Sequence, residues 1–116
     1  MKISLKNYLF ICLILFTSQI MAAGDIAAGK EKSAMCVACH GADGKSTMPV
    51  VPGMVVPNIG GQYADYLVKT LKDYRSGSRK NPNMNGMAAS LSDQDIENLA
   101  AYYSSLDGLN VVKNPN

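Results

Sequence analysis

Apolar positions recur with a helical period through residues 63–76 of this 116-residue chain. Six mostly apolar side chains, spaced three or one apart, form the stripe: Tyr63, Tyr66, Leu67, Thr70, Leu71 and Tyr74. The charged residues of this segment fall off the stripe, as in an amphipathic helix. Glycine is favoured just beyond a helix C-terminus, and Gly77 occupies that place. We therefore predict a helix from about Tyr63 to Ser76.

Two further helices are predicted, one near each end of the domain. Asp25 is a suitable N-cap for a short helix that continues to about Met35. The last helix opens with Ser92-Asp93-Gln94-Asp95, which resembles a capping box with Asp in place of Glu, and Gly108 ends it. We expect the first and last helices to pack together with the middle helix beside them. The apolar face of the last helix is Ile96, Leu99, Ala100 and Tyr103.

The stretches between these helices are predicted to be loops. Residues 41–61 contain five glycines and three prolines, and residues 78–90 form a second loop. Residues 48–57 are unusually apolar for a loop. Because loops normally lie on the surface, this part is expected to lie against something apolar, either the face of a cofactor or ordinary core.

The N-terminus has the pattern of a secretory signal peptide. Two lysines precede an apolar run over residues 8–16, and small residues follow at Ala22 and Ala23. The run is shorter than the roughly 20 residues that span a bilayer. We predict a removed signal peptide over 1–22, with cleavage after Ala22 or Ala23, a domain over 23–108 and a loose polar tail over 109–116. This predicts a periplasmic protein without stable membrane insertion.

Removal of the signal peptide changes the charge balance. The whole chain has 11 basic and 9 acidic residues, and Lys2 and Lys6 leave with the signal peptide. The remaining chain is near neutral, which gives no support to nucleic-acid binding or to an anionic membrane surface. Its size fits one small domain with a modest core.

The chemistry is concentrated in Cys36-Val37-Ala38-Cys39-His40, a C-x-x-C-H run. This spacing is the attachment signature of c-type haem. Each thiol can add to one haem vinyl group, and His40 can then present a ring nitrogen to the iron. A covalently held haem would also supply an apolar body for the helices to pack around.

Three other kinds of site can contain a C-x-x-C pair: a thioredoxin-like redox pair, a zinc site and a structural disulfide. A thioredoxin-like pair requires a βαβ context, which is missing around residues 36–40. A structural zinc site requires about four ligands, and the chain without its signal peptide has no further Cys or His. A disulfide between Cys36 and Cys39 would constrain the unfolded chain very little. Haem attachment is therefore the favoured interpretation, and the disulfide is the main alternative.

The sixth iron ligand decides the chemistry. His40 is the only histidine, so a second histidine ligand is excluded and methionine is the natural partner. Met48 and Met54 lie in the apolar loop, where they can simply fill gaps. Met84 and Met87 lie in a polar loop, which favours a ligand role, and the pattern favours Met84 but leaves Met87 open. For the other ring nitrogen of His40 we expect a carbonyl acceptor near Pro49 or Pro52.

Several motifs together resemble one haem domain of the bacterial cytochrome c4 family, which consists of class I c-type cytochromes. The resemblance covers residues 24–106 and is carried by Cys36 to Gly44, Gly60-Gly61-Gln62, Arg79-Lys80, Met84-Asn85-Gly86-Met87, and the segment from Leu91 to Tyr102. In the family pattern the first methionine of M-x-G-M is the axial ligand, which implies Met84 here. Family members commonly carry two such domains, whereas this chain has a single C-x-x-C-H.

The resemblance implies an all-α cytochrome c-like domain of three or more helices around one covalent haem c, acting as a one-electron carrier rather than an enzyme. Redox proteins, such as respiratory complexes, would dock at the haem edge of a monomer or dimer. One alternative is a haem subunit of a larger oxidoreductase, for example one that acts on a sulfur compound. Another is a sensor or enzyme with an open iron position, although no distal histidine exists for it.

Overall fold

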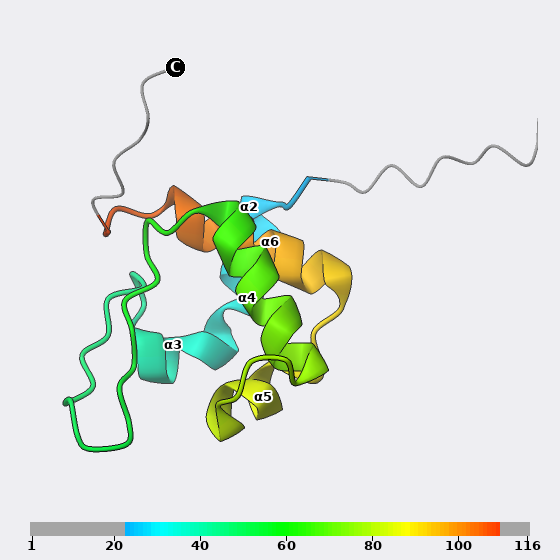
Figure 1. The fold of residues 1–116 in the computed structure, drawn as a ribbon. Coiled ribbons are helices and arrows are strands. Elements are labelled where there is room, and N and C mark those ends of the chain that lie inside the picture. The colour runs from blue at the N-terminus through cyan, green and yellow to red at the C-terminus, as the bar shows by residue number, and fades with distance from the viewer. Residues whose placement is uncertain (1–22, 110–116) are drawn as a thin grey trace, which may run out of the picture.

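The computed structural model describes residues 23–109, which fold into helices and connecting loops (Figure 1). Among these residues no strand forms, and the only bridge joins Val51 and Met54. The all-α prediction is therefore confirmed, while the predicted signal peptide and nearly all of the predicted tail lie outside the described residues. The helices are α2 (Ile26–Lys32), α3 (Ala34–His40), α4 (Ala64–Ser76), α5 (Pro82–Ala88) and α6 (Asp93–Ser105).

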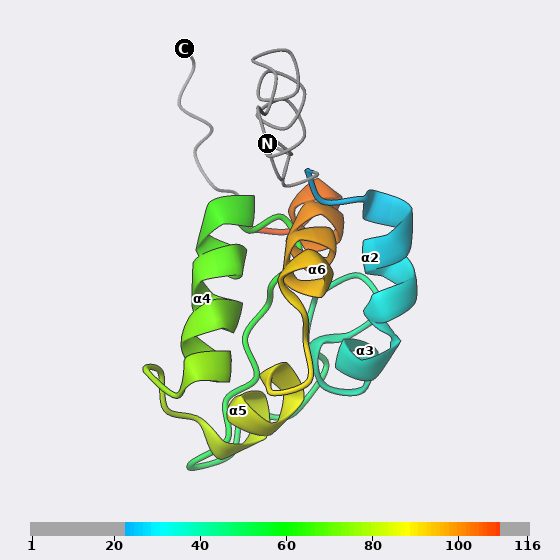
Figure 2. The ribbon, with the colours of Figure 1, turned by 90° about the vertical axis from the view of Figure 1, so that its right-hand side faces the viewer.

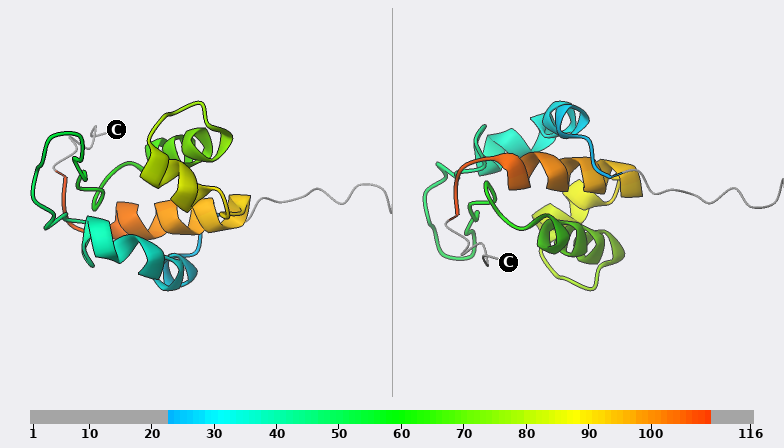
Figure 3. Two further views of the ribbon diagram at one scale, coloured as in Figure 1. Left: turned by 90° about the horizontal axis from the view of Figure 1, so that it is seen from below. Right: turned by 90° about the horizontal axis from the view of Figure 1, so that it is seen from above.

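Helix α6 is the centre of the packing. Helix α2 lies along one side of it and α4 along the other, as Figure 2 and both views of Figure 3 show. The predicted arrangement of first, last and middle helices is thus confirmed. Most of the core side chains come from α6 and from the segment just before it. The buried core consists of Leu67, Ala88, Leu91, Ile96, Leu99, Ala100, Tyr102 and Tyr103.

The close crossing of α2 and α6 depends on Gly29, which has no side chain. A Cβ on Gly29 would lie 2.0 Å from the carbonyl oxygen of Asn98 and 2.8 Å from Cβ of Tyr102. Neither distance is possible for a real methyl group, so only glycine lets the two backbones approach this closely. The side chain of Asn98 adds a polar contact, because its Oδ1 accepts from the backbone N–H of Asp25 at 2.8 Å.

The ends of α4 and α6 follow local sequence rules. Gly77 ends α4 with φ +81°, a conformation that favours glycine. Ser92 and Asp95 form the predicted capping box, each side chain bonding the backbone of the other residue. Helix α6 nevertheless ends at Ser105, before the predicted stop at Gly108.

The predicted helix over residues 25–35 is wrong in its extent. Asp25 does cap α2, since its carboxylate accepts from the backbone N–H of Ala28. However, α2 ends at Lys32, and Ser33 separates it from α3, which carries the C-x-x-C-H run. The Ser33 hydroxyl donates to the Lys30 carbonyl at 2.7 Å. Local side-chain bonding of this kind competes with a continuous helix, and it turns the chain at Ser33.

The prediction of a loop over residues 78–90 is also wrong, because α5 occupies Pro82–Ala88. Asn81 is its N-cap, with the side chain accepting from the backbone N–H of Met84 at 3.1 Å, and Pro82 fills the first helical position. Asparagine followed by proline is a known helix-start signal. The segment itself has weak helix propensity, so contacts with the rest of the domain stabilise the helix.

The long segment between α3 and α4 projects from the helices in Figure 1. None of residues 48–56 belongs to the described core, so the expectation that they cover ordinary core is not met. Val50 is 80% exposed and Val55 is 66% exposed. Among the described residues, none of the helices has the length and apolar character needed to cross a membrane.

Candidate functional site

Helix α3 brings the two thiols and the imidazole together. Cys36 and Cys39 are three residues apart, so they share one face of the helix, and His40 is its last residue. Cys36 packs partly buried against the core, Cys39 is exposed, and His40 is buried. A single turn of helix therefore presents two thiols from one face and a buried imidazole beside them.

The imidazole of His40 is held by the backbone. Its Nδ1 lies 2.9 Å from the carbonyl oxygen of Pro57 and donates to it. The expectation of an acceptor near Pro49 or Pro52 is therefore wrong. The loop after α3 folds back so that Pro57, rather than either of those prolines, lies beside the imidazole. When Nδ1 carries the proton, Nε2 keeps its lone pair and can serve as a metal ligand.

Several hydrogen bonds fix the Pro57 carbonyl relative to α3. The backbone N–H of Ile59 donates to the Gly44 carbonyl at 2.8 Å, and Ser46 N–H donates to Oδ1 of Asn58 at 2.8 Å. The Ser46 hydroxyl also donates to the carbonyl of Cys39 at 3.1 Å. The two ends of the projecting loop are thereby joined next to the imidazole.

Beside Cys36 lies the buried hydroxyl of Tyr103, which makes no hydrogen bond of good geometry to any residue that the structure describes. Cys36 packs against the cluster that contains Tyr103, and burial raises the pKa of its thiol. Burial likewise raises the pKa of the neighbouring Tyr103. Leaving a buried hydroxyl unpaired costs about 1–3 kcal/mol. This polar group next to the attachment thiol fits a site that is completed by a bound group.

The candidate methionines differ in their surroundings. Met84 is half-buried in α5, whereas Met87, one turn further on, is 47% exposed. Met54 lies on the projecting loop with 36% exposure. In Figure 2, α5 and α3 lie toward the same end of the molecule. Of the two methionines in the M-x-G-M run, Met84 therefore has the more sheltered position, and it lies on a capped helix.

Comparison with known proteins adds the family. Residues 26–107 match the family model for cytochrome c. The chain belongs to the cytochrome c family. It is 51% identical over 86 residues to cytochrome c-554(548) of Halomonas halodenitrificans, an alignment that covers 72% of this chain and 98% of that protein.

The resemblance to one haem domain of cytochrome c4 is confirmed. The chain is 43% identical to the cytochrome c4 of Pseudomonas aeruginosa over 85% of its own length and 48% of that protein. The crystal structure of reduced recombinant cytochrome c4 from Pseudomonas stutzeri superimposes with a TM-score of 0.66 and 45% identity, covering 75% of this chain and 48% of that one. The chain spans about half the length of these cytochromes c4.

As a cytochrome c, the protein is an electron-transfer protein and not an enzyme, and its cofactor is covalently bound haem c. The residues on α3 fit this group, because the two thiols and the imidazole are the donors that haem c requires. Haem c supplies the one-electron chemistry of iron when it is bound, and Cys36, Cys39 and His40 are the residues of α3 that would hold it.

Sequence reasoning did not identify three residues whose contacts hold the His40 ring or α5: Pro57, Asn85 and Arg79. Nothing in the sequence distinguished Pro57 from the other prolines of the loop. The Asn81-Pro82 pair was a usable signal for α5, and hence for the ordered position of Asn85. Arg79 was noted only as part of the family resemblance, and its surroundings come from the packing of the α4–α5 loop.

Proposed function

We propose that the protein is a periplasmic one-electron carrier whose haem c is attached to Cys36 and Cys39 and ligated by His40 and Met84. The observation that carries this proposal is the contact of His40 Nδ1 with the Pro57 carbonyl at 2.9 Å. It assigns the proton to Nδ1, which leaves Nε2 as the ligand atom and fixes the ring in one orientation. A histidine that only filled space would not need this support.

Met84 suits the other axial position because α5 is held at its start and at its middle. Asn81 caps its start, and the side chain of Asn85 bonds carbonyls outside the helix. A thioether ligand raises the reduction potential of haem iron. If both oxidation states keep the same two ligands, little rearrangement accompanies electron transfer. The rigid α5 therefore supports a carrier with a closed iron site.

Redox partners dock near the attachment motif in this proposal. Cys39 is exposed, so the haem edge joined to it would lie close to the surface. Electron-transfer encounters typically bury less than about 1,200 Å², which a small exposed edge can supply. The donors and acceptors would be respiratory or dehydrogenase complexes, and the protein would act as a monomer or dimer. The periplasmic location rests on the signal-peptide pattern of residues 1–22.

A second candidate function is that of a permanent haem subunit of a sulfur-compound dehydrogenase. One relative, named thiosulfate dehydrogenase electron acceptor, from Thiomonas intermedia, is 39% identical over 69% of this chain and 35% of that protein. Gel filtration of the protein from its native host distinguishes the two functions. A free carrier elutes as a small monomer or dimer, and a subunit co-elutes with a larger oxidoreductase.

Carbon monoxide tests the axial ligands directly. The reduced wild-type protein should keep its low-spin visible spectrum when carbon monoxide is added, because the sixth position is closed. Met84→Ala should form an adduct rapidly, whereas the matched variant Met87→Ala should behave like the wild type. Rapid adduct formation by the wild type would refute the closed site. Adduct formation by Met87→Ala alone would transfer the ligand role to Met87.

A further inference from the structure

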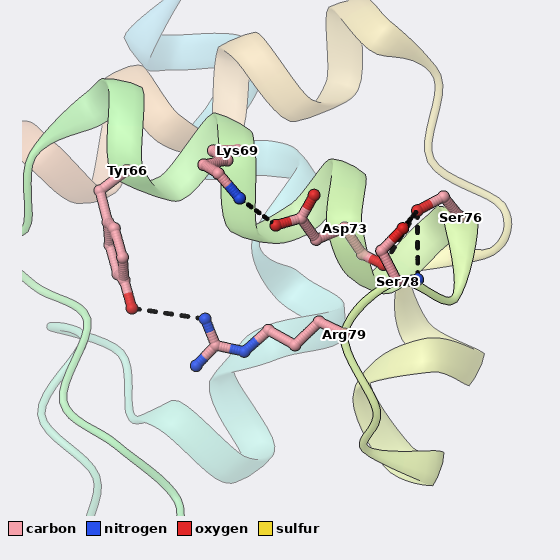
Figure 4. Close-up of polar contacts among 6 residues, drawn as sticks. All are labelled: Tyr66, Lys69, Asp73, Ser76, Ser78 and Arg79. Atoms are coloured by element: carbon pink, nitrogen blue, oxygen red, sulfur yellow. Dashed lines mark hydrogen bonds and ion pairs between the residues drawn. The ribbon is translucent and has the colours of Figure 1, made fainter.

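The hydroxyl of Tyr103 is a polar group that the fold buries without giving it a hydrogen bond of good geometry. Tyr103 is 3% exposed, and among the described residues its hydroxyl oxygen has no such partner. Two other tyrosine hydroxyls are bonded: that of Tyr66 accepts from Arg79 at the surface, as Figure 4 shows, and that of Tyr102 donates to the Ala42 carbonyl at 3.3 Å. A buried polar group without a partner is unfavourable, so the Tyr103 hydroxyl needs an explanation.

The ring of Tyr103 is held in the core by its surroundings. Its backbone carbonyl accepts from the N–H of Gly61 at 2.8 Å. The centre of its ring lies 5.1 Å from that of Tyr102, and a Cβ on Gly44 would lie 3.3 Å from its Cδ1. The hydroxyl therefore cannot reach water unless this packing is broken.

The Cys36 thiol lies beside this hydroxyl. Cys36 packs against the core cluster that contains Tyr103. Burial is the main cause that raises the pKa of each group, and hydrogen bonding between the two groups adds to the rise for Tyr103 and opposes it for Cys36. The Ser33 side chain, also buried, influences Tyr103 as well, but less than Cys36 does. Cys36 and Ser33 are thus the polar side chains within reach of the hydroxyl.

The hydrogen-bonding capacity of these neighbours favours the sulfur of Cys36 as the acceptor. The Ser33 hydroxyl donates its proton to the Lys30 carbonyl at 2.7 Å. When the Cys36 thiol adds to a haem vinyl group, the S–H bond breaks, a C–S bond forms, and the hydrogen goes to the other vinyl carbon. The resulting thioether sulfur has no proton and can only accept. The Tyr103 hydroxyl must then be the donor in any bond between the two groups.

We propose that the Tyr103 hydroxyl donates a hydrogen bond to the thioether sulfur that Cys36 forms with the haem, and that this bond raises the reduction potential. This inference rests on the proposed function, because it assumes haem c attached to Cys36. The positive end of the O–H dipole faces a sulfur joined to the macrocycle. Ferric iron carries one more positive charge than ferrous iron, so this dipole disfavours the ferric state. Tyr103 is a positioning residue and does not ligate the iron.

Proton NMR of the reduced, haem-loaded protein tests the hydrogen bond, because low-spin ferrous haem is diamagnetic. We expect a slowly exchanging Tyr103 hydroxyl proton with a nuclear Overhauser contact to the β protons of Cys36. Tyr103→Phe should lose this signal. The matched control is Tyr102→Phe, which removes a hydroxyl from the adjacent residue. The control should keep the signal, because the Tyr102 hydroxyl bonds a backbone carbonyl instead.

The midpoint potential tests the effect of the bond on the iron. Tyr103→Phe should have a lower potential than the wild type, and Tyr102→Phe should change the potential less. A hydroxyl that only filled space would give the opposite sign. Its removal would make the surroundings of the haem more apolar, and such surroundings favour the ferrous state and raise the potential.

Three results would overturn the inference: a Tyr103 hydroxyl proton that exchanges fast, one that contacts Ser33 and not Cys36, or an unchanged or higher potential in Tyr103→Phe. Failure of the proposed function appears separately. Peptide mass spectrometry that finds no haem on Cys36 would overturn both proposals, whereas haem on Cys36 without the hydroxyl contact would overturn this inference alone. If the sixth position proves open, carbon monoxide keeps the ferrous iron diamagnetic, so the NMR test does not depend on Met84.

Discussion

The side-chain amide of Asn85 donates to the carbonyl oxygen of Tyr74 at 2.7 Å. The same amide group donates to the Arg79 carbonyl at 2.8 Å, and its oxygen accepts from the backbone N–H of Asn81 at 2.9 Å. One side chain thereby joins the end of α4, the following loop and the start of α5. It stands next to Met84, so the position of the proposed ligand depends on a residue that need not touch the haem.

Replacing Asn85 by Ala should weaken both the domain and the closed iron site. Three hydrogen bonds are lost, and at about 0.5–1.5 kcal/mol each the free energy of unfolding should fall by about 1.5–4.5 kcal/mol. Denaturant titration of the haem-loaded protein measures this loss. The reduced variant should also bind carbon monoxide faster than the wild type, because α5 is held less firmly.

Asn83→Ala is the matched control for that experiment, since Asn83 is an exposed residue of the same helix. Its unfolding free energy should change by no more than about 0.5 kcal/mol. Equal losses in the two variants would contradict a specific role of the Asn85 hydrogen bonds, because alanine has the higher helix propensity and neither loss could then be assigned to that network.

These contacts explain why α5 was missed, whereas α4 and α6 were predicted. The stripe of α4 and the capping box of α6 are local patterns, and each is visible within one stretch of sequence. Residues 82–88 contain Pro, Asn and Gly, which favour turns. Asn81-Pro82 is a local helix-start signal, but the helix also depends on carbonyls of Tyr74 and Arg79, which no local pattern reveals. The thiols and the imidazole were predictable because haem attachment requires a fixed spacing of Cys36, Cys39 and His40, which is visible within one short stretch of sequence.

The partner of His40 shows the same limit of sequence reasoning. That its ring would bond a carbonyl followed from general metal-site chemistry. The identity of that carbonyl depends on how the apolar loop folds back. Hydrogen bonds within the loop, such as the one from Ser46 N–H to Asn58 Oδ1, determine this fold. Pro57, rather than Pro49 or Pro52, is placed by these contacts between distant residues.

Asn58→Ala should therefore loosen the support of His40. The Ser46 N–H would lose its acceptor, and the unfolding free energy should fall by about 1 kcal/mol. In the reduced, haem-loaded protein the Nδ1 proton of His40 should exchange slowly with solvent, and faster in the variant, as measured by NMR. Asn58→Asp keeps an acceptor oxygen and should retain slow exchange. Fast exchange in the wild type would contradict the bond to Pro57.

Gly29→Ala should separate α2 from α6. The new methyl group would lie 2.0 Å from the Asn98 carbonyl oxygen, so one backbone must move. Overpacking of this kind typically costs about 1–3 kcal/mol, and a clash with backbone belongs at the upper end. Thermal unfolding of the haem-loaded protein measures the loss. The control is Ala27→Ser, an exposed change in the same helix that should stay within about 0.5 kcal/mol. A stable Gly29→Ala protein would refute the close crossing.

The capping box of α6 should make stability depend on pH through Asp95. The hydrogen bond from the backbone N–H of Ser92 holds the pKa of Asp95 below its usual value, and the ion pair with Lys32 acts in the same direction. A carboxyl with a lowered pKa in the folded state stabilises the protein above its unfolded pKa, near 3.9. That contribution is lost as the pH falls through the lower, folded value.

The test is to compare the wild type with Asp95→Asn by denaturant titration at several pH values. The difference in unfolding free energy should be largest near neutral pH and should disappear once Asp95 of the folded wild type is protonated. Asp93, whose pKa is lowered by Arg75, is present in both proteins and so cancels in the difference. Ser92→Ala should lose about 1 kcal/mol as an N-cap. A difference between wild type and Asp95→Asn that stays constant with pH would mean that the charge of Asp95 does not stabilise α6.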